Sequence, residues 1–450
     1  MPETDLDRML DEIYGRVGEV APQPRLDATR RALELLGDPQ RTFPIVHITG
    51  TNGKTSTARI TESLLRAHGL RTGLFTSPDL GYLGERIVVD GEPIAPEALV
   101  AAWDDVQQVL RLADGELAGR GEPPLTFFEA LTVLAFAVFA DAPIDVGVIE
   151  VGMGGEWDST NVADGQVAVL TPVDLDHTKR LGDTVAEIAR TKSGIVKPGA
   201  AVVAAAQAPE ALAEIERAVE LSEGTLSLEG RDFRVLRRTP AVGGQLIDVQ
   251  GRAGRYDGLL VPLLGAHQAQ NADVAIAAVE TFLGDGARPI VGDVLQEGLA
   301  AATSPGRLQV AASDPVVVVD AAHNPHGVRA MVAGLAEAFP FSRLVAVVAV
   351  LDDKDAPGMI RAAADAVDEF VVTTAPSDRA TDPDALAATV VDVVGADRVV
   401  VEPELERALE AARELADDAE PGEEGQRGGV VVFGSITLVA RALELLRAER

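Results

Sequence analysis

Apolar residues along the chain recur in two patterns that together predict an α/β protein. Short, almost unbroken apolar runs, as at residues 146–151 and 167–171, are typical of buried strands. Longer segments in which apolar residues return every three or four positions, such as 97–112 and 126–140, predict helices. Residues 1–42 show the same helical period. We therefore expect helices and strands to alternate along most of the chain.

The alternation is interrupted at Pro305 and Gly306, which break regular structure. A fresh series of strands and helices follows, as in a small doubly wound domain. We therefore predict one domain over residues 1–302 and a second over residues 303–450. Acidic residues and glycine at 416–428 predict a loop within the second domain.

The segment FPIVHITGTNGKTST, residues 43–57, has the order of a phosphate-binding strand, turn and helix. Its apolar run ends in a turn that contains Gly50 and Gly53, which tolerate tight backbone curvature. Lys54 and Thr55 then open a segment with helical periodicity. In such an arrangement backbone N–H groups and the helix N-terminus face an anion, the lysine reaches the outer phosphates and the hydroxyl can bind Mg²⁺.

A plain strand, turn and helix without a ligand is the alternative for this segment. The P-loop consensus has a glycine where this chain has Ile48, so only the Gly-Lys-Thr triplet at residues 53–55 fits. Such triplets are common by chance. The strand before the triplet and the helix after it favour phosphate binding.

Polar residues follow two further predicted strands. Glu150 lies near the end of one strand, and Asp174, Asp176 and His177 lie in the loop after the next. Because ligands bind outside the carboxyl ends of parallel strands, we expect these groups to converge with the Lys54 loop. Together, beside a nucleotide loop, they suit Mg²⁺, although a tolerated charge or a surface histidine is the better explanation of either residue alone.

Two other polar residues lie at the ends of predicted helices. Lys192 is near a helix C-terminus, where lysine usually complements the helix dipole. A desolvated, neutral lysine could instead take up CO₂ as a carbamate ligand for a second metal ion. His267, Gln268 and Asn271 lie in the first turns of a later helix, where polar residues usually act as caps.

Composition excludes several classes of partner. The chain of 450 residues carries a formal net charge of −32, so a nucleic-acid or anionic-membrane partner would gain nothing from counterion release. The chain has no cysteine, which rules out disulfides, thiolate metal sites and a cysteine nucleophile. Its start does not resemble a signal peptide, and its most apolar run is too short to span a bilayer. We therefore expect a soluble cytoplasmic protein.

Several strings occur in an order that resembles the folylpolyglutamate synthase/dihydrofolate synthase family of the Mur-ligase superfamily. They are TGTNGKTS, TSPDLGYLGERIVVDG, FFEALT, EVGMGGEWDSTN, LGDTVAEIARTKSGI, GAHQAQNA, SPGRLQV, DAAHNPHG and LDDKD, within residues 45–355. The resemblance implies an ATP-dependent amide ligase in which the γ-phosphate passes to a carboxylate of a pterin substrate. The amino group of L-glutamate then attacks the acyl phosphate.

The resemblance also implies the fold and the partners. It implies a P-loop ATPase domain with a mostly parallel sheet at 1–302 and a smaller Rossmann-like domain at 303–450. The implied small molecules are ATP, L-glutamate and either dihydropteroate or a reduced folate, bound by a monomer.

Site residues follow from the resemblance position by position. It implies nucleotide contacts from Gly50, Thr51, Asn52, Gly53, Lys54, Thr55, Ser56, Asn271, Arg307, Asp320 and His323. It implies two Mg²⁺ sites, one with Ser77 and Glu150 and one with Glu150, His177 and carbamylated Lys192. It implies a catalytic group of Lys54, Glu150, His177 and Lys192. It implies pterin contacts from Thr76, Pro78, Asp79, Arg86, Phe127 and Phe128.

The chain departs from the family pattern at four positions. The family usually has histidine at Asp79, asparagine at Gly84, arginine at Glu156 and glycine at Ala321. These departures leave the expected ATP and metal chemistry intact and affect the expected acceptor. An arginine-to-glutamate change reverses a local charge near an anionic substrate.

Two other functions fit part of the sequence. Another amino-acid ligase of the same superfamily would share the phosphate loop, but the peptidoglycan-precursor ligases carry a whole UDP-binding domain before it, whereas some forty residues precede it here. A regulator that hydrolyses ATP without ligation would need neither a second metal site nor the second domain. Whether the enzyme adds the first glutamate, extends a polyglutamate tail, or does both stays open.

Overall fold

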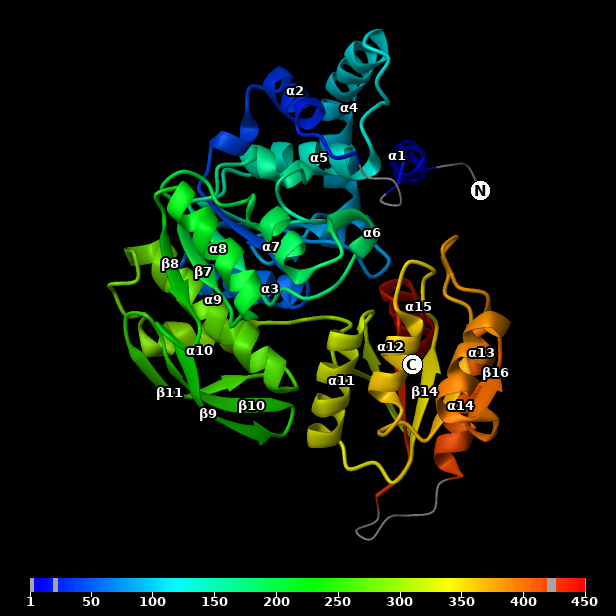
Figure 1. Cartoon of the computed structure of the whole chain (residues 1–450). Coiled ribbons are helices and arrows are strands. Elements are labelled where there is room, and N and C mark those ends of the chain that lie inside the picture. Colours follow the sequence, from blue (N-terminus) through cyan, green and yellow to red (C-terminus); the bar gives the residue numbers. More distant parts are fainter. Residues whose placement is uncertain (1–3, 19–22, 419–425, 450) are drawn as a thin grey trace. The chain divides into compact units, whose positions relative to one another are not determined.

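The chain folds into two units, each built on its own sheet, as the computed structural model shows for residues 4–18, 23–418 and 426–449 (Figure 1). Unit 1 comprises Met1–Leu236, Asp248–Leu259 and Gln270–Ala302, and unit 2 comprises Arg237–Ile247, Leu260–Ala269 and Thr303–Arg450. The units therefore interleave in sequence before residue 303. The assignment of domains to 1–302 and 303–450 stays a prediction.

The eight-stranded sheet of unit 1 has the order β4-β3-β2-β5-β1-β6-β7-β8, with β1 (Ile45–Thr49) near its centre. Its strands from β2 to β8 in that order are parallel, and β3 and β4 are antiparallel additions at one edge. The other strands are β2 (Thr72–Phe75), β3 (Ile87–Val89), β4 (Glu92–Pro93), β5 (Val146–Glu150), β6 (Val167–Leu170), β7 (Ala201–Ala204) and β8 (Thr225–Leu228). Because Ile48 pairs with Glu150 and Thr49 with Leu170, the carboxyl ends of β1, β5 and β6 are level.

Helices surround this sheet. They are α1 (Asp5–Tyr14), α2 (Asp27–Leu35), α3 (Lys54–Ala67), α4 (Pro96–Gly119), α5 (Phe127–Asp141), α6 (Thr178–Leu181), α7 (Val185–Ser193), α8 (Pro209–Leu221) and α10 (Gly292–Ala301). The helix α9 (Ala266–Gly284) has residues in both units. The helix α3, which follows the glycine turn, packs against β1, β2 and β5.

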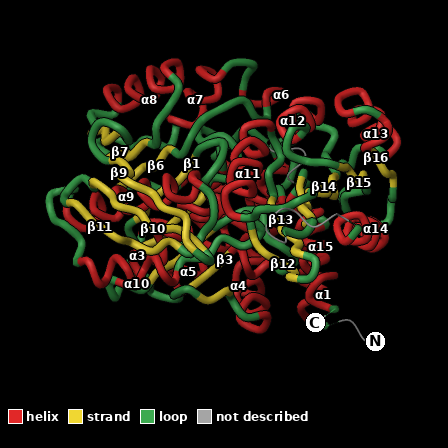
Figure 2. The backbone as a smooth tube through the Cα atoms, turned by 90° about the horizontal axis from the view of Figure 1, so that it is seen from below, coloured by secondary structure: helices red, strands yellow, loops and turns green. Residues whose placement is uncertain are grey.

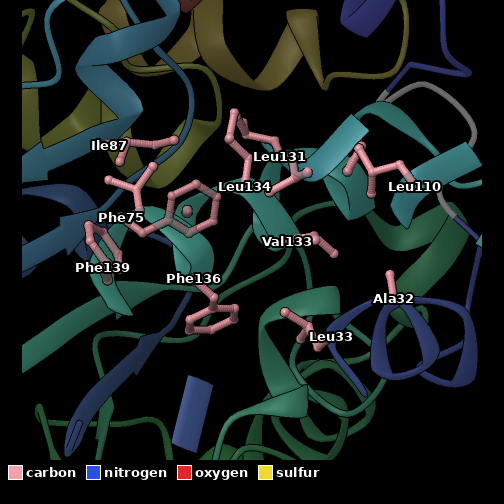
Figure 3. Packing of buried hydrophobic residues seen from close by; sticks show 14 of the residues in the cluster. Ala32, Leu33, Phe75, Ile87, Leu110, Leu131, Val133, Leu134, Phe136 and Phe139 are labelled. Carbon is pink, nitrogen blue, oxygen red and sulfur yellow. The ribbon is translucent and has the colours of Figure 1, made fainter. Parts of the chain in front are cut away.

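The largest apolar core described lies between α5 and one face of the sheet. Figure 3 shows Phe75 of β2 and Ile87 of β3 beside Phe139 of α5, with Leu33 of α2 and Leu110 of α4 on the far side of α5. Each of these five side chains is 1% exposed or less. Burying one such side chain stabilises the fold by about 1.5–3 kcal/mol, so this core holds the sheet and its strand ends in place.

A smaller, three-stranded sheet is formed by the part of the sequence in which segments of the two units alternate. Its order is β11-β10-β9, and its strands are β9 (Arg234–Ala241), β10 (Gly244–Gln250) and β11 (Arg255–Val261).

Unit 2 contains a six-stranded sheet in the order β12-β13-β17-β14-β15-β16. All neighbours are parallel except β12 and β13. Helices α11–α13 cover one face, and α14 and α15 cover the other (Figure 2). The strands are β12 (Gln309–Ser313), β13 (Val316–Asp320), β14 (Leu344–Val348), β15 (Glu369–Val372), β16 (Val399–Val401) and β17 (Gly429–Phe433). The helices are α11 (Pro325–Ala338), α12 (Ala356–Ala363), α13 (Pro383–Val394), α14 (Leu405–Asp417) and α15 (Ile436–Ala448).

The predicted α/β class with mostly parallel sheets is confirmed. One helix is longer than predicted, because α4 continues past residue 112 to Gly119. Ala113 and Leu117 extend its buried apolar stripe by two more turns. The loop predicted at 416–428 lies mainly outside the described residues.

Candidate active site

The turn between β1 and α3 requires glycine at two positions. Gly50 has a φ of 150°, and a Cβ there would lie 1.8 Å from the Thr171 hydroxyl oxygen. Gly53 has a φ of 86°, and a Cβ there would lie 2.5 Å from Oδ1 of Asn271. Both values are far below the closest approach of real side chains, so the predicted glycine turn is confirmed and any side chain at either position would open it.

Two lysines from different helices donate hydrogen bonds to the same carbonyl of this turn. Lys54 Nζ lies 3.1 Å from the Gly50 oxygen and 3.2 Å from the Thr51 oxygen. Lys192 Nζ, from the last turn of α7, lies 2.6 Å from the Gly50 oxygen, and Lys192 is only 4% exposed. Lys192 therefore supports the turn between β1 and α3. A lysine that only complemented the dipole of α7 would not need this hydrogen bond.

Glu150 joins the phosphate loop to the loop after β2. One of its carboxylate oxygens accepts a hydrogen bond of 2.9 Å from the Thr55 hydroxyl, and the other accepts one of 3.4 Å from the Ser77 backbone N–H. Glu150 is 1% exposed. A buried carboxylate beside a hydroxyl at the ends of parallel strands has the oxygen chemistry that Mg²⁺ requires.

The loop after β6 also reaches the phosphate loop. The Thr51 hydroxyl donates to the Asp174 carbonyl at 2.9 Å and accepts from the Asp174 N–H at 3.1 Å. His177 precedes α6 with a φ of 49°, and its Nε2 lies 3.7 Å from Oδ2 of Asp176. The part of the chain that the structure describes contains no group of three or more His, Cys, Asp or Glu side chains able to hold a metal ion. The predicted metal set has only Glu150 and His177 of those types.

The residues predicted to hold the pterin lie in one region of unit 1. Arg86 Nε lies 2.6 Å from Oδ2 of Asp79, and the Arg86 guanidinium carbon lies 5.2 Å from the centre of the Phe127 ring. The Thr76 N–H donates to the Arg86 carbonyl at 3.1 Å. Phe128 stacks on Phe75 with ring centres 5.7 Å apart.

Burial distinguishes these residues. Phe127 is 4% exposed and packs within the core, whereas Phe128 is half-buried. Thr76 is 2% exposed, and Pro78, which follows Ser77 through a cis peptide bond, is exposed.

Two of the four positions that depart from the family pattern, Gly84 and Glu156, have distinct surroundings in the structure. A Cβ at Gly84 would lie 2.3 Å from the Tyr82 ring and 2.7 Å from the Ile94 carbonyl, so the larger family residue does not fit here. The Glu156 side chain is exposed, and its backbone packs against Gly194.

Further nucleotide residues predicted in unit 1 are buried or half-buried around the turn. Asn52 is half-buried, Ser56 is 3% exposed and Asn271 is 5% exposed. Asn271 is the sixth residue of α9 and faces Gly53, so it does not cap the helix.

The predicted residues of unit 2 form a separate group. Asp320 accepts hydrogen bonds of 2.8 Å from the N–H groups of Leu308 and Ala322. His323 Nδ1 lies 2.9 Å from the Ala321 carbonyl, and Arg307 is half-buried two residues after a proline. Asp320 therefore fixes the backbone at Leu308, next to Arg307, and at Ala322 in the loop that follows β13.

Sequence reasoning missed several buried carboxyl groups, among them Asp158 and Asp273. Asp158 is 5% exposed, accepts from the N–H groups of Met153 and Thr160, and has its pKa raised by burial. Asp273 is fully buried in α9, has no hydrogen-bond partner for either oxygen, and has its pKa raised by burial to about 8. An aspartate between glycines and Ser-Thr-Asn could have indicated the first, but nothing in the sequence indicates the second.

The sequence matches two protein families. The Mur ligase middle domain matches residues 48–279, and the Mur ligase glutamate ligase domain matches residues 306–436. A relative from Mycobacterium tuberculosis, named dihydrofolate synthase/folylpolyglutamate synthase, is 42% identical over 455 residues, which cover 98% of this chain and 93% of the relative.

Two solved structures are similar over almost their whole length. Folylpolyglutamate synthase from Mycobacterium tuberculosis complexed with ADP has a TM-score of 0.94 and 41% identity, with 98% of each chain covered. A structure described as an FPGS–AMPPCP–folate complex has a TM-score of 0.82 and 31% identity, covering 98% of this chain and 100% of that one. No helix in the described part of the chain is long and apolar enough to cross a membrane.

Proposed function

This chain belongs to the folylpolyglutamate synthase/dihydrofolate synthase family of Mur-type ligases, and we propose that the site in unit 1 carries out the ATP-dependent ligation of that family. The enzyme forms a C–N bond between L-glutamate and a folate-type acceptor. One observation carries the assignment of the site. One oxygen of Glu150 accepts a hydrogen bond from Thr55 of the phosphate loop. The other accepts one from Ser77 in the loop between β2 and β3, residues 76–86, which we call the acceptor loop.

The proposed reaction has two steps. A carboxylate oxygen of the acceptor attacks the γ-phosphorus of ATP, and the bond to the bridging oxygen of ADP breaks. The amino nitrogen of L-glutamate then attacks the acyl carbon, loses a proton and expels inorganic phosphate. Both steps require that the negative charge of the phosphates be offset and that the reacting groups be aligned.

Residues of the turn supply the first requirement. Lys54 donates to two turn carbonyls and lies at the N-terminus of α3, where backbone N–H groups can hold an anion. Thr55 and Ser56 lie in the first turn of α3, whose N-terminal dipole favours negative charge. Asn271 lies against Gly53 and is proposed as a further nucleotide contact.

The donor set around Glu150 fits magnesium. Ser77 and Glu150 would hold one ion, and Glu150, His177 and a carbamate on Lys192 would hold a second. Bound Mg²⁺ would offset charge on the phosphates. The burial of Lys192 beside the turn supports the carbamate. Its two oxygens would add to the few metal-binding groups that Glu150 and His177 provide.

The acceptor and nucleotide contacts of the remaining residues are part of the proposal. Relatives in complex with ADP and with AMPPCP and folate support ATP and a folate as ligands. The acceptor would lie along Thr76, Pro78, Asp79, Arg86, Phe127 and Phe128. Arg307, Asp320 and His323 of unit 2 are proposed as nucleotide contacts, and the protein is proposed to act as a monomer.

The test is phosphate release from purified protein with ATP, Mg²⁺ and L-glutamate, offered dihydropteroate or tetrahydrofolate separately. Turnover that needs both acceptor and glutamate supports the proposal, and the acceptor used decides between the two activities. ATP hydrolysis that ignores both substrates would identify a non-ligating ATPase. Lys54→Met serves as the inactive control.

A further inference from the structure

A buried ion pair lies within the loop between β2 and β3. The side chains of Arg86 and Asp79 are 7% and 13% exposed, and their closest atoms are 2.6 Å apart. The second oxygen of Asp79 accepts a hydrogen bond of 3.1 Å from the Gly81 N–H. Both oxygens of the carboxylate are therefore occupied inside the loop.

The flat face of Arg86 is also occupied. Its guanidinium carbon lies 5.2 Å from the centre of the Phe127 ring. Phe127 in turn stacks on Tyr14 of α1, with ring centres 5.3 Å apart and an angle of 11° between the rings. A guanidinium stacks on an aromatic ring through its planar face while its edge bonds a carboxylate. Asp79 and Phe127 together fix Arg86 by its edge and its face.

The ion pair is connected to the reacting end of the site. The Arg86 carbonyl accepts from the Thr76 N–H, and the neighbouring Ser77 N–H donates to Glu150. An acceptor carboxylate that took Arg86 for itself would leave Asp79 buried without its cation. An uncompensated buried charge is strongly unfavourable, so such an exchange would oppose binding.

We propose that Asp79 is a positioning residue that sets acceptor specificity, because it keeps Arg86 against Phe127 with its charge already neutralised. The acceptor loop then recognises the flat, uncharged part of the acceptor, and the carboxylates of a glutamate tail gain nothing from Arg86. This inference rests on the proposed function, which assigns the loop to the acceptor.

The test uses ligands that share a ring system and differ in their number of carboxylates. Dihydropteroate and a reduced folate triglutamate are titrated against the full-length protein, and the ratio of their dissociation constants is measured in wild type and in the double variant D79N/R86Q. Since that variant removes a pair that is neutral overall, we expect a ratio within about twofold of wild type. A tenfold loss of triglutamate preference, which corresponds to about 1.4 kcal/mol, would show that Arg86 binds a carboxylate and would overturn the inference.

The single variant D79N gives the opposite expectation. It leaves the charge of Arg86 uncompensated, so the ratio should shift at least fivefold toward the triglutamate. An unchanged ratio would show that Asp79 has no part in specificity.

Stability is controlled with R343Q/E369Q, which removes a part-buried Arg–Glu pair of unit 2 and should leave the ratio unchanged. If D79N/R86Q does not fold, D79A/R86M replaces it with the same expectation. Turnover is measured in parallel. A wild-type protein that binds both ligands but ligates neither contradicts the proposed function and leaves this inference to be decided by the binding ratios.

Discussion

The side-chain nitrogen of Lys192 lies 2.6 Å from the carbonyl oxygen of Gly50, although the two residues are 142 positions apart in sequence. The contact joins the last turn of α7 to the turn between β1 and α3. Lys54 donates to the same oxygen. A substitution at Lys192 would therefore alter the hydrogen bonding of the turn where we propose that the phosphates bind.

Replacing Lys192 should therefore abolish ligation with little loss of fold. We expect Lys192→Ala to lower kcat at least 100-fold and to lower the free energy of unfolding by about 1–3 kcal/mol, since one hydrogen bond to a buried carbonyl is lost. If the amine carries a carbamate, formate or acetate should restore part of the activity. Activity that stays absent while the affinity for Mg²⁺ is unchanged would refute the carbamate. Lys197→Met, which removes a lysine bonded to the Asn161 carbonyl, controls for the loss of a buried amine.

Glu150→Gln tests the proposed magnesium site. The amide keeps the size of the side chain but lacks the charge and one acceptor oxygen, so we expect kcat to fall on the order of 100-fold. Titration calorimetry should show weaker binding of Mg²⁺–ATP and unchanged binding of ATP in the presence of a chelator. Equal losses in both titrations would mean that Glu150 supports only the structure of the turn.

Gly84→Ala should weaken acceptor binding without affecting the nucleotide. Its Cβ would press on the Tyr82 ring, and that ring cannot easily withdraw because its hydroxyl donates to the Ile94 carbonyl at 2.7 Å. We expect a cost of about 1–3 kcal/mol from overpacking, expressed as a higher KM for the acceptor. A KM for ATP that rises by the same factor would contradict this assignment. Gly81→Ala, where a Cβ would meet nothing within 4 Å, separates loop strain from steric contact, because Gly81 also has a positive φ of 131°.

Asp273 should make the fold less stable as the pH rises. Burial, with Glu229 and Glu280 nearby, raises its pKa to about 8 from 3.8, so the folded chain binds a proton that the unfolded chain releases between these values. The free energy of unfolding is therefore unaffected by this group below pH 4. It falls as the pH rises toward 8, by on the order of 5 kcal/mol at most. Asp273→Asn should be more stable than wild type at pH 8 and equally stable near pH 4. Parallel unfolding curves for the two proteins across this range would contradict the shift.

Sequence patterns predicted the local parts of the site well. The glycine turn, the strand that ends at Glu150 and the helix that carries Lys192 each follow from short-range periodicity and turn chemistry. The level ends of β1, β5 and β6 follow from the rule that parallel strands share an edge.

Contacts between distant side chains could not be predicted in this way. The bond from Lys192 to Gly50 depends on the packing of α7, and the pairing of Asp79 with Arg86 depends on the path of an irregular loop. Asp273 occupies a helical position that a sequence pattern cannot separate from an exposed one. The short helix α6 was not predicted, because four residues are too few to show a period.

We propose that the acceptor carboxylate is activated by transfer of the γ-phosphate before glutamate attacks. The most direct test supplies acceptor with ¹⁸O in the reacting carboxylate, together with ATP, Mg²⁺ and L-glutamate, and measures the isotope in the phosphate released. If the carboxylate is phosphorylated first, one ¹⁸O atom is expected in the phosphate for each amide bond formed. Unlabelled phosphate, or phosphate formed without amide, would contradict it.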